Sequence, residues 1–141
     1  MNAKTNIYFN LAKMYEFVCD ALDISENENH SNKSYKHSIN MCILQIGEYA
    51  NRIDQIQLEN NVSVITKSNI NFSEIRGIRN RIAHSYVNID YSIIDDVIKN
   101  DLPNLKNYIE NTVDKNILND PYILYEYEYE DALKNLNDRS L

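Results

Sequence analysis

The sequence predicts an all-α protein, folded as an up-and-down bundle of four to five helices. The chain has only 2 Gly and 2 Pro among its 141 residues, far fewer than turn-rich β-sandwiches or glycine-rich nucleotide loops need. Apolar residues also recur at steps of three and four, which is the period of an amphipathic helix. With 43% hydrophobic and 25% charged residues, a chain of this length can form one hydrophobic core.

The first two expected helices are long. The first covers residues 6–24, and its predicted buried stripe comprises Tyr8, Leu11, Tyr15, Val18, Cys19 and Leu22. Residues 25–33 are polar without periodicity, and a longer second helix follows them, which Asn60 and Asn61 end. The second stripe comprises Ile39, Cys42, Ile43, Ile46, Ala50, Ile53 and Ile56. Both cysteines are therefore interpreted as small buried apolar groups.

Two further helices are expected in the second half. The third begins near Phe72, with Asn71 or Ser73 as its cap, and its apolar positions are Ile75, Ile78 and Ile82. Asp90 caps the fourth. Its apolar positions are Ile93, Ile94, Val97, Leu102, Leu105 and Ile109. Pro103 should kink this helix, because proline lacks the N–H donor and its ring clashes with the preceding turn.

The C-terminal segment is rich in Tyr and Glu. We divide the chain into a helical bundle at 1–118 and a C-terminal helix or arm at 119–141. Residues 125–130 read YEYEYE, a period nearer two than 3.6, which leaves two structures open. A fifth helix is preferred over an extended acidic arm, because a lone strand would find no sheet in a helical chain.

Several classes of protein are disfavoured. No apolar run approaches the ~20 residues that cross a bilayer, and Lys4, Asn10 and Lys13 interrupt the N-terminal segment. We therefore expect a cytoplasmic protein without a membrane segment. The two cysteines form no C-x-x-C pattern and have no histidine cluster nearby, so neither a zinc site nor another metal or cofactor is expected.

Positive charge gathers at one place in an acidic chain. The net charge is −7, which repels nucleic acid at long range. However, Arg76, Arg79 and Arg81 lie within six positions on the third expected helix. The sequence thus predicts one basic spot that could capture phosphate groups locally.

The polar side of this helix carries a candidate catalytic group. Arg76, Asn80 and His84 follow one another at i, i+4 spacing, whereas Arg79 lies about 140° around the helix from His84. One straight helix cannot hold a small group between Arg79 and His84. Either the helix distorts after Ala83, or two subunits face each other across a two-fold axis. We favour the dimer.

An imidazole and a guanidinium suit metal-free cleavage of RNA. Histidine can accept or donate a proton near neutral pH, and arginine can bind the scissile phosphate as a fork. The RNA's own 2′-hydroxyl would then be the nucleophile. The same residues also fit an ordinary solvated helix face, and Tyr86 could be a packing residue.

The residues Arg79 to Tyr86, RNRIAHSY, resemble the R-x4-H-x-Y motif of the HepT-like HEPN family. Upstream, Ile46-Gly47-Glu48-Tyr49-Ala50 is similar to the family's Gly-Glu-Ala element. Downstream, Asn88-Ile89-Asp90 and Asp101-Leu102-Pro103-Asn104-Leu105 resemble its later landmarks. The resemblance covers roughly residues 5–115, and its four landmarks occur in the family's order.

The resemblance implies a dimeric bundle with metal-independent endoribonuclease activity, the toxin of a type VII toxin–antitoxin system. The implied partner is a minimal nucleotidyltransferase antitoxin. Arg79 and His84 would be the catalytic pair, and Tyr86 would accept AMP. The implied supporting residues are Asn80, Arg76, Arg81 and Glu48.

Other interpretations stay open. Glu48 could orient an arginine at the cleft, or simply pair with Arg52 one turn along its own helix. The protein could also be a non-catalytic subunit that binds a nucleotide or the partner of a nucleotidyltransferase complex. In a third interpretation, it is an interaction protein whose helices only bury a subunit interface.

Overall fold

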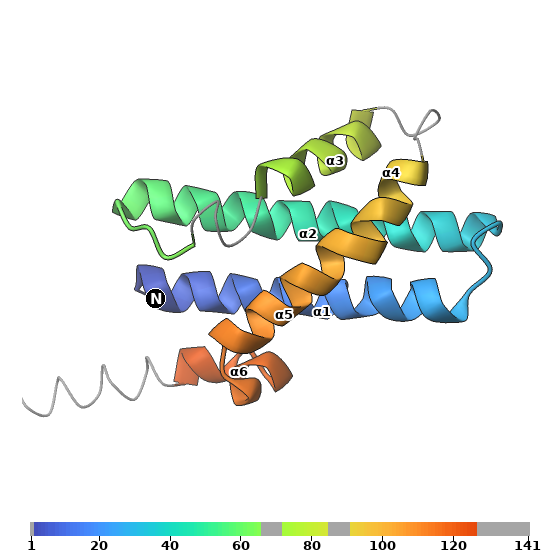
Figure 1. Cartoon of the computed structure of the whole chain (residues 1–141). Helices are drawn as coiled ribbons and strands as arrows, with labels where there is room; N and C mark the ends of the chain where they lie inside the picture. Colours follow the sequence, from blue (N-terminus) through green and yellow to red (C-terminus); the bar gives the residue numbers. More distant parts are fainter. Residues whose placement is uncertain (1, 66–71, 85–90, 127–141) are drawn as a thin grey trace, which may run out of the picture.

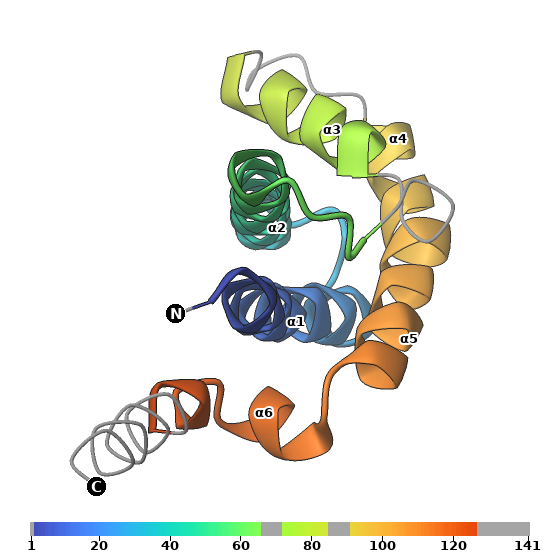
Figure 2. The ribbon, with the colours of Figure 1, turned by 90° about the vertical axis from the view of Figure 1, so that its left-hand side faces the viewer.

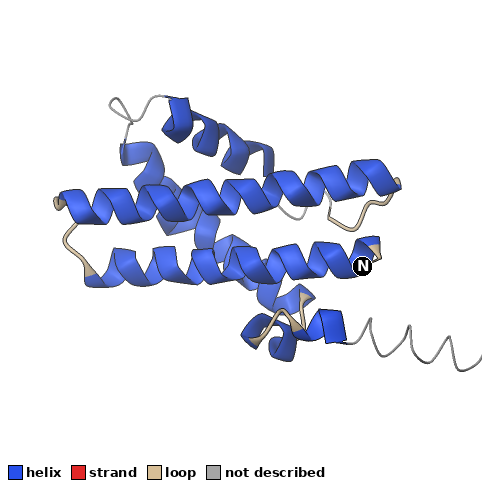
Figure 3. Ribbon diagram, turned by 180° about the vertical axis from the view of Figure 1, so that it is seen from behind, coloured by secondary structure: helices blue, strands red, loops and turns tan. Residues whose placement is uncertain are grey.

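The computed structural model describes residues 2–65, 72–84 and 91–126, without the side chains of Phe72, Arg81 and His84. Every regular element in these ranges is a helix, and no strand occurs among them (Figure 3). The predicted all-α class is therefore confirmed. None of the helices in these ranges is both long and apolar enough to cross a membrane.

Two long antiparallel helices form the base of the fold (Figure 1). They are α1 (Ala3–Asn27) and α2 (Lys33–Asn60). The Asn2 side chain accepts a hydrogen bond from the Thr5 N–H at 2.8 Å, which caps α1. Asn61 adopts the left-handed conformation, with φ 51°, and ends α2. The predicted end of the second helix is thus confirmed.

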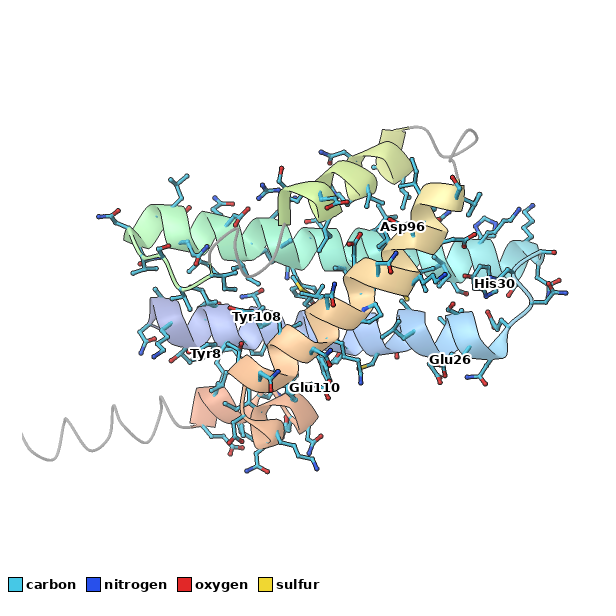
Figure 4. The ribbon with its side chains drawn as sticks, viewed as in Figure 1. Tyr8, Glu26, His30, Asp96, Tyr108 and Glu110 are labelled. Carbon is cyan, nitrogen blue, oxygen red and sulfur yellow. The ribbon has the colours of Figure 1, made fainter. Side chains whose placement is uncertain are left out.

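The connection between these helices is held by a ring contact. His30, labelled in Figure 4, stacks on Tyr35 with ring centroids 4.2 Å apart. The His30 Nε2 atom lies 2.7 Å from the Ser25 carbonyl oxygen. The loop is thereby tied both to the end of α1 and to the start of α2.

The predicted stripe of α1 is displaced by about one position. The residues at its centre are Ile7, Leu11, Met14, Val18 and Ala21, all 0% exposed. Tyr8, Tyr15, Leu22 and Cys19 are only partly buried, so the prediction that they are buried was wrong. A tyrosine keeps its hydroxyl near water at the margin of a helix contact, whereas Ile7 and Met14 can be buried entirely. The stripe of α2 is confirmed apart from Ile56, which is partly buried.

The remaining helices pack on this pair. Helix α3 (Phe72–His84) contacts α2 and buries Ile75, Ile78 and Ile82, as expected. Because α3 begins at Phe72, Ser73 lies inside it, and Asn71 lies outside the described residues.

A continuous helical rod then crosses the hairpin obliquely (Figure 1). It comprises α4 (Tyr91–Asp96), η2 (Val97–Asp101) and α5 (Leu102–Thr112). Asp90, the expected cap of this rod, also lies outside the described residues.

The irregularity expected at Pro103 takes the form of a π turn. In η2, the Leu102 N–H donates to the Val97 carbonyl oxygen, five residues earlier. Proline has no N–H, and its ring would meet the carbonyl of Lys99 in a regular α-helix. A wider turn immediately before Pro103 relieves this clash, and the helix continues into α5.

The chain then turns back under α1. A short helix, α6 (Lys115–Asn119), was not predicted, and Asp114 caps it by accepting from the Asn116 N–H at 2.8 Å. Residues 123–126 form a further helical turn in which Leu124 is buried. Residues 127–141 lie outside the described part of the chain, so the choice between helix and arm for that segment, and the boundary at 118, stay predictions.

Candidate active site

The contact between α2 and α3 depends on a residue without a side chain. A Cβ atom placed on Gly47 would lie 2.6 Å from both Cβ and Cγ of Arg79, closer than such atoms approach in proteins. Gly47 is buried, so the aliphatic stem of Arg79 packs directly on the backbone of α2. The glycine thus fixes how deeply Arg79 is set between the two helices.

The head of Arg79 is held by two neighbours. Its Nη2 group donates to Glu48 Oε1 in an ion pair between α3 and α2. Its Nη1 group donates to Asn80 Oδ1 at 3.0 Å. The Arg79 side chain is 28% exposed and that of Glu48 39% exposed. The guanidinium is therefore oriented by the protein and remains accessible from solvent.

The ion pair of Glu48 joins two helices and not two turns of one helix. Among the described residues, the structure does not show the alternative pair with Arg52 on α2. The Arg52 guanidinium instead lies 5.0 Å from the centroid of the Tyr49 ring. Glu48 instead forms an ion pair with Arg79 of α3, and its supporting role at a catalytic cleft stays a prediction.

A second ion pair runs parallel to the first. Arg76 Nη1 contacts Asp54 Oδ2, and both side chains are about one third exposed. The expected basic spot is therefore partly neutralised, because two of its three arginines face carboxylates of α2. A phosphate group must share these guanidinium groups with Glu48 and Asp54.

Asp54 was not identified from the sequence. When two helices are antiparallel, a residue late in one helix lies opposite a residue early in the other. Glu48 and Asp54 on α2 accordingly face Arg79 and Arg76 on α3 in reverse order. This reversed order of opposite charges is visible in the sequence only once the two helices are known to be antiparallel neighbours.

The structure describes the other expected site residues only in part. Asn80 is exposed beside Arg79. His84 is the last residue of α3, and the side chains of His84 and Arg81 lie outside the described part. Tyr86 falls within residues 85–90, which are also outside it. The relation of Arg79 to His84 and Tyr86 stays a prediction.

Two polar residues of the rod, Tyr91 and Asp101, lie close to the site helices. Asn40 of α2 is 2% exposed, and its Nδ2 donates to the Tyr91 hydroxyl at 3.3 Å, at the start of α4. At the last residue of the π turn, burial and the negative charges of Glu74 and Asp96 raise the pKa of Asp101. The chain that follows the motif is thus anchored on α2, and the Asp101 landmark lies near the start of α3.

The described residues contain no group of three or more His, Cys, Asp or Glu side chains arranged to bind a metal. The contacts of Arg79 offer the chemistry of an oriented arginine beside a carboxylate and an amide. Such an arginine can bind an anionic oxygen pair through the part of the guanidinium that faces solvent.

Comparisons with known proteins show which family the chain resembles. Residues 11–112 match the family model described as "Ribonuclease HepT-like". Two relatives from Methanocaldococcus jannaschii are named "Putative RNase MJ0125" and "Putative RNase MJ1380". The first is 26% identical over 110 residues, covering 78% of this chain and 90% of the relative. The second is 28% identical over 109 residues, covering 77% of this chain and 94% of the relative.

No solved structure matches the chain with significance. The family model nevertheless covers the whole α2–α3 contact, including Gly47, Glu48 and Arg79, and extends to the end of α5. The chain belongs to the HepT-like ribonuclease family.

Proposed function

We propose that this protein is an endoribonuclease toxin of a type VII toxin–antitoxin system, and that Arg79 and His84 carry out the cleavage. The observation that carries the proposal is the setting of Arg79, which packs on Gly47 and pairs with Glu48. This setting joins the two elements that resemble the family's motifs. Membership in a family of ribonucleases supports the activity.

The proposed reaction needs one proton acceptor and one proton donor. The 2′-oxygen of the RNA attacks the adjacent phosphorus as an imidazole takes its proton, and a P–O2′ bond forms. The P–O5′ bond breaks, and the leaving 5′-oxygen receives a proton. The products are a 2′,3′-cyclic phosphate and a 5′-hydroxyl. Arg79 would hold the non-bridging phosphate oxygens as their negative charge grows.

A homodimer suits this chemistry. A two-fold axis would bring two motif helices together, so that one His84 accepts a proton and the other donates one. The isolated chain should then have twice its own mass on light scattering. It would work in the cytoplasm on cellular RNA, with no metal ion needed for the reaction.

Tyr86 supplies the proposed control. The nucleotidyltransferase antitoxin would transfer AMP from ATP to the Tyr86 hydroxyl, forming a phosphodiester bond and releasing pyrophosphate. The added negative charge, two residues beyond His84, would repel RNA phosphates from Arg79. Treatment with the antitoxin and ATP should add the mass of one AMP to the parent and none to Tyr86→Phe.

The decisive experiment is incubation of the purified chain with labelled cellular RNA in excess EDTA. His84→Ala, Arg79→Ala and the control Lys99→Ala, an exposed cation on η2, are tested alongside, with folding checked by circular dichroism. The parent and Lys99→Ala should leave 2′,3′-cyclic phosphate ends, and the other two variants should not. Because Arg76 and Arg79 capture phosphates locally in an acidic chain, cleavage should fall steeply as salt rises.

A negative result would have a defined meaning. If a folded dimer with an unmodified Tyr86, verified by mass, cleaves no RNA, the catalytic proposal is wrong. Binding of ATP or AMP without turnover would then identify the protein as a nucleotide-binding subunit of a nucleotidyltransferase complex.

A further inference from the structure

Aromatic rings and cations alternate along one side of the α1–α2 hairpin. We call this set the aromatic strip. It consists of Phe9, Lys13, Phe17, Tyr49, Arg52, Tyr122 and Tyr125. Helix α1 supplies three members, α2 supplies two, and the turn after α6 supplies the two tyrosines that follow Pro121. The catalytic proposal above uses none of these residues.

The two C-terminal tyrosines present their rings to solvent. Tyr122 is 57% exposed and Tyr125 is 50% exposed, although Leu124 between them is buried. Their rings stack with centroids 6.1 Å apart, and both meet the edge of Phe9, at 5.5 and 5.2 Å. Leu124 and Phe9 thus hold in place two rings that each remain about half exposed.

Cations lie against the rings at both ends of the strip. Lys13 Nζ is 5.5 Å from the centroid of the Tyr122 ring. Arg52 lies 5.0 Å from the Tyr49 ring, which in turn stacks on Phe17 at 6.1 Å. Glu16, the acidic neighbour of Lys13, is bound to it at 3.1 Å. Positive groups and flat apolar faces are therefore interleaved over a short distance.

A pocket of about 370 Å³ adjoins the strip. Its wall includes Tyr125, Phe9 and Arg52, the amide side chains of Asn6, Asn10 and Gln55, and the side chains of Ile56 and Glu59. The Asn10 amide donates to Asn6 and the Gln55 amide donates to Glu59, at 3.0 and 2.9 Å. The pocket thus joins an aromatic face, a guanidinium, several amides and one carboxylate.

The strip begins one helical turn from the candidate active site. Glu48, Arg52 and Gln55 follow one another on α2 at steps of four and three, so they share one face of the helix. At 1.5 Å per residue, Gln55 lies about 10 Å along α2 from Glu48, a distance that about two nucleotides can span. Figure 2 shows the α4–α5 rod on the side of the hairpin away from the helical turn at residues 123–126.

We propose that the aromatic strip binds the bases of single-stranded RNA next to the cleavage site, with Tyr122 and Tyr125 as the stacking surface and Arg52 contacting a phosphate. Stacking on aromatic rings beside a positive groove is how proteins hold single strands without reading their sequence. A protein partner would find few apolar side chains here other than rings, and it would have to cover the two cations at the ends of the strip. The inference rests on the proposed function, because it extends the path of the RNA substrate.

The test measures binding separately from cleavage. A fluorescein-labelled oligouridylate with 2′-O-methyl groups cannot be cut by 2′-hydroxyl attack, so its anisotropy reports binding alone. Tyr125→Ala and Arg52→Ala should each weaken binding on the order of tenfold, since one stacked base contributes about that much. Tyr125→Phe should bind as the parent does. Controls are Leu58→Ala, at an 82% exposed position, and Lys99→Ala on η2.

Cleavage then gives a second, independent readout. Tyr125→Ala should raise KM for a long single strand and leave kcat unchanged. It should cut a dinucleotide, which extends only one nucleotide to each side of the scissile phosphate, as fast as the parent. Weaker oligouridylate binding in the variants supports the strip even if no RNA is ever cleaved. Equal binding by parent and variants overturns it, whether or not cleavage occurs. Loss of the dimer on light scattering with unchanged RNA binding also overturns it, and marks a subunit contact.

Discussion

Arg79 of α3 lies against the backbone of Gly47 on α2, and its guanidinium donates to the adjacent Glu48. Two consecutive residues of α2 thus set both the depth and the orientation of one arginine. The glycine acts by having no side chain, and the glutamate acts through its charge. These two roles can be tested separately.

Gly47→Ala should disturb the site and the fold together. The added methyl group would overlap the stem of Arg79, so we expect a loss of about 1–3 kcal/mol in the free energy of unfolding, with cleavage at least tenfold slower. Gly77→Ala is the matched control, because a Cβ there meets no described atom within 4 Å. It should stabilise α3 by about 0.5–1 kcal/mol and retain activity. Urea unfolding of both variants would contradict this account if they were equally stable.

Glu48→Gln should change activity more than stability. The ion pair is partly exposed, so its loss should cost less than about 1 kcal/mol. We expect kcat to fall about tenfold because Arg79 is no longer oriented, and KM not to rise because a negative charge beside the phosphate is removed. Glu110→Gln breaks the exposed pair with Lys106 on α5 and should change neither constant. A parental kcat in Glu48→Gln would show that Arg79 needs no such partner.

Asp101 should give the stability a specific pH dependence. Burial, together with Glu74 and Asp96, raises the pKa of Asp101 above its usual 3.8, and its Oδ2 atom has no hydrogen-bond partner among the described residues. The folded state therefore favours the neutral acid, so stability is lost as pH rises through the folded pKa. Asp101→Asn should raise Tm at pH 7, and the difference should vanish as pH falls below 3.8. A Tm difference that is the same at every pH would refute this, and Asp95→Asn on the exposed side of α4 is the control.

The two cysteines should react at different rates. Burial raises the pKa of the Cys42 thiol to about 11, which leaves about a hundredfold less thiolate, the reactive form, than an ordinary thiol has at the same pH. Burial also raises the pKa of Cys19, but this residue is partly exposed. Iodoacetamide at pH 8 should therefore label Cys19 before Cys42, as followed by mass spectrometry. In urea both should react alike, and a native Cys42 that reacted as fast as in urea would exclude this explanation.

Hydrophobic periodicity alone predicted the helices that bury one face in the core. The stripes of α2 and α3 follow from branched residues at steps of three and four, because such residues have no polar group to keep near water. On α1, tyrosines alternate with aliphatic residues, and the sequence does not say which of two adjacent stripes is central. Packing against both α2 and α5 decides it in favour of Ile7 and Met14.

The sequence by itself thus determined the helical class, the end of α2 at Asn61 and the motif from Arg79 to Tyr86. Each depends on local properties, which are backbone propensity, hydrophobic period and the order of residues along one chain. Only the tertiary structure decided that Glu48 pairs with Arg79 and not with Arg52, that Asp54 belongs beside Arg76, and that Tyr122 and Tyr125 lie on Phe9. These are contacts between residues far apart in the chain. They depend on how the helices are placed relative to one another, which hydrophobic periodicity does not specify.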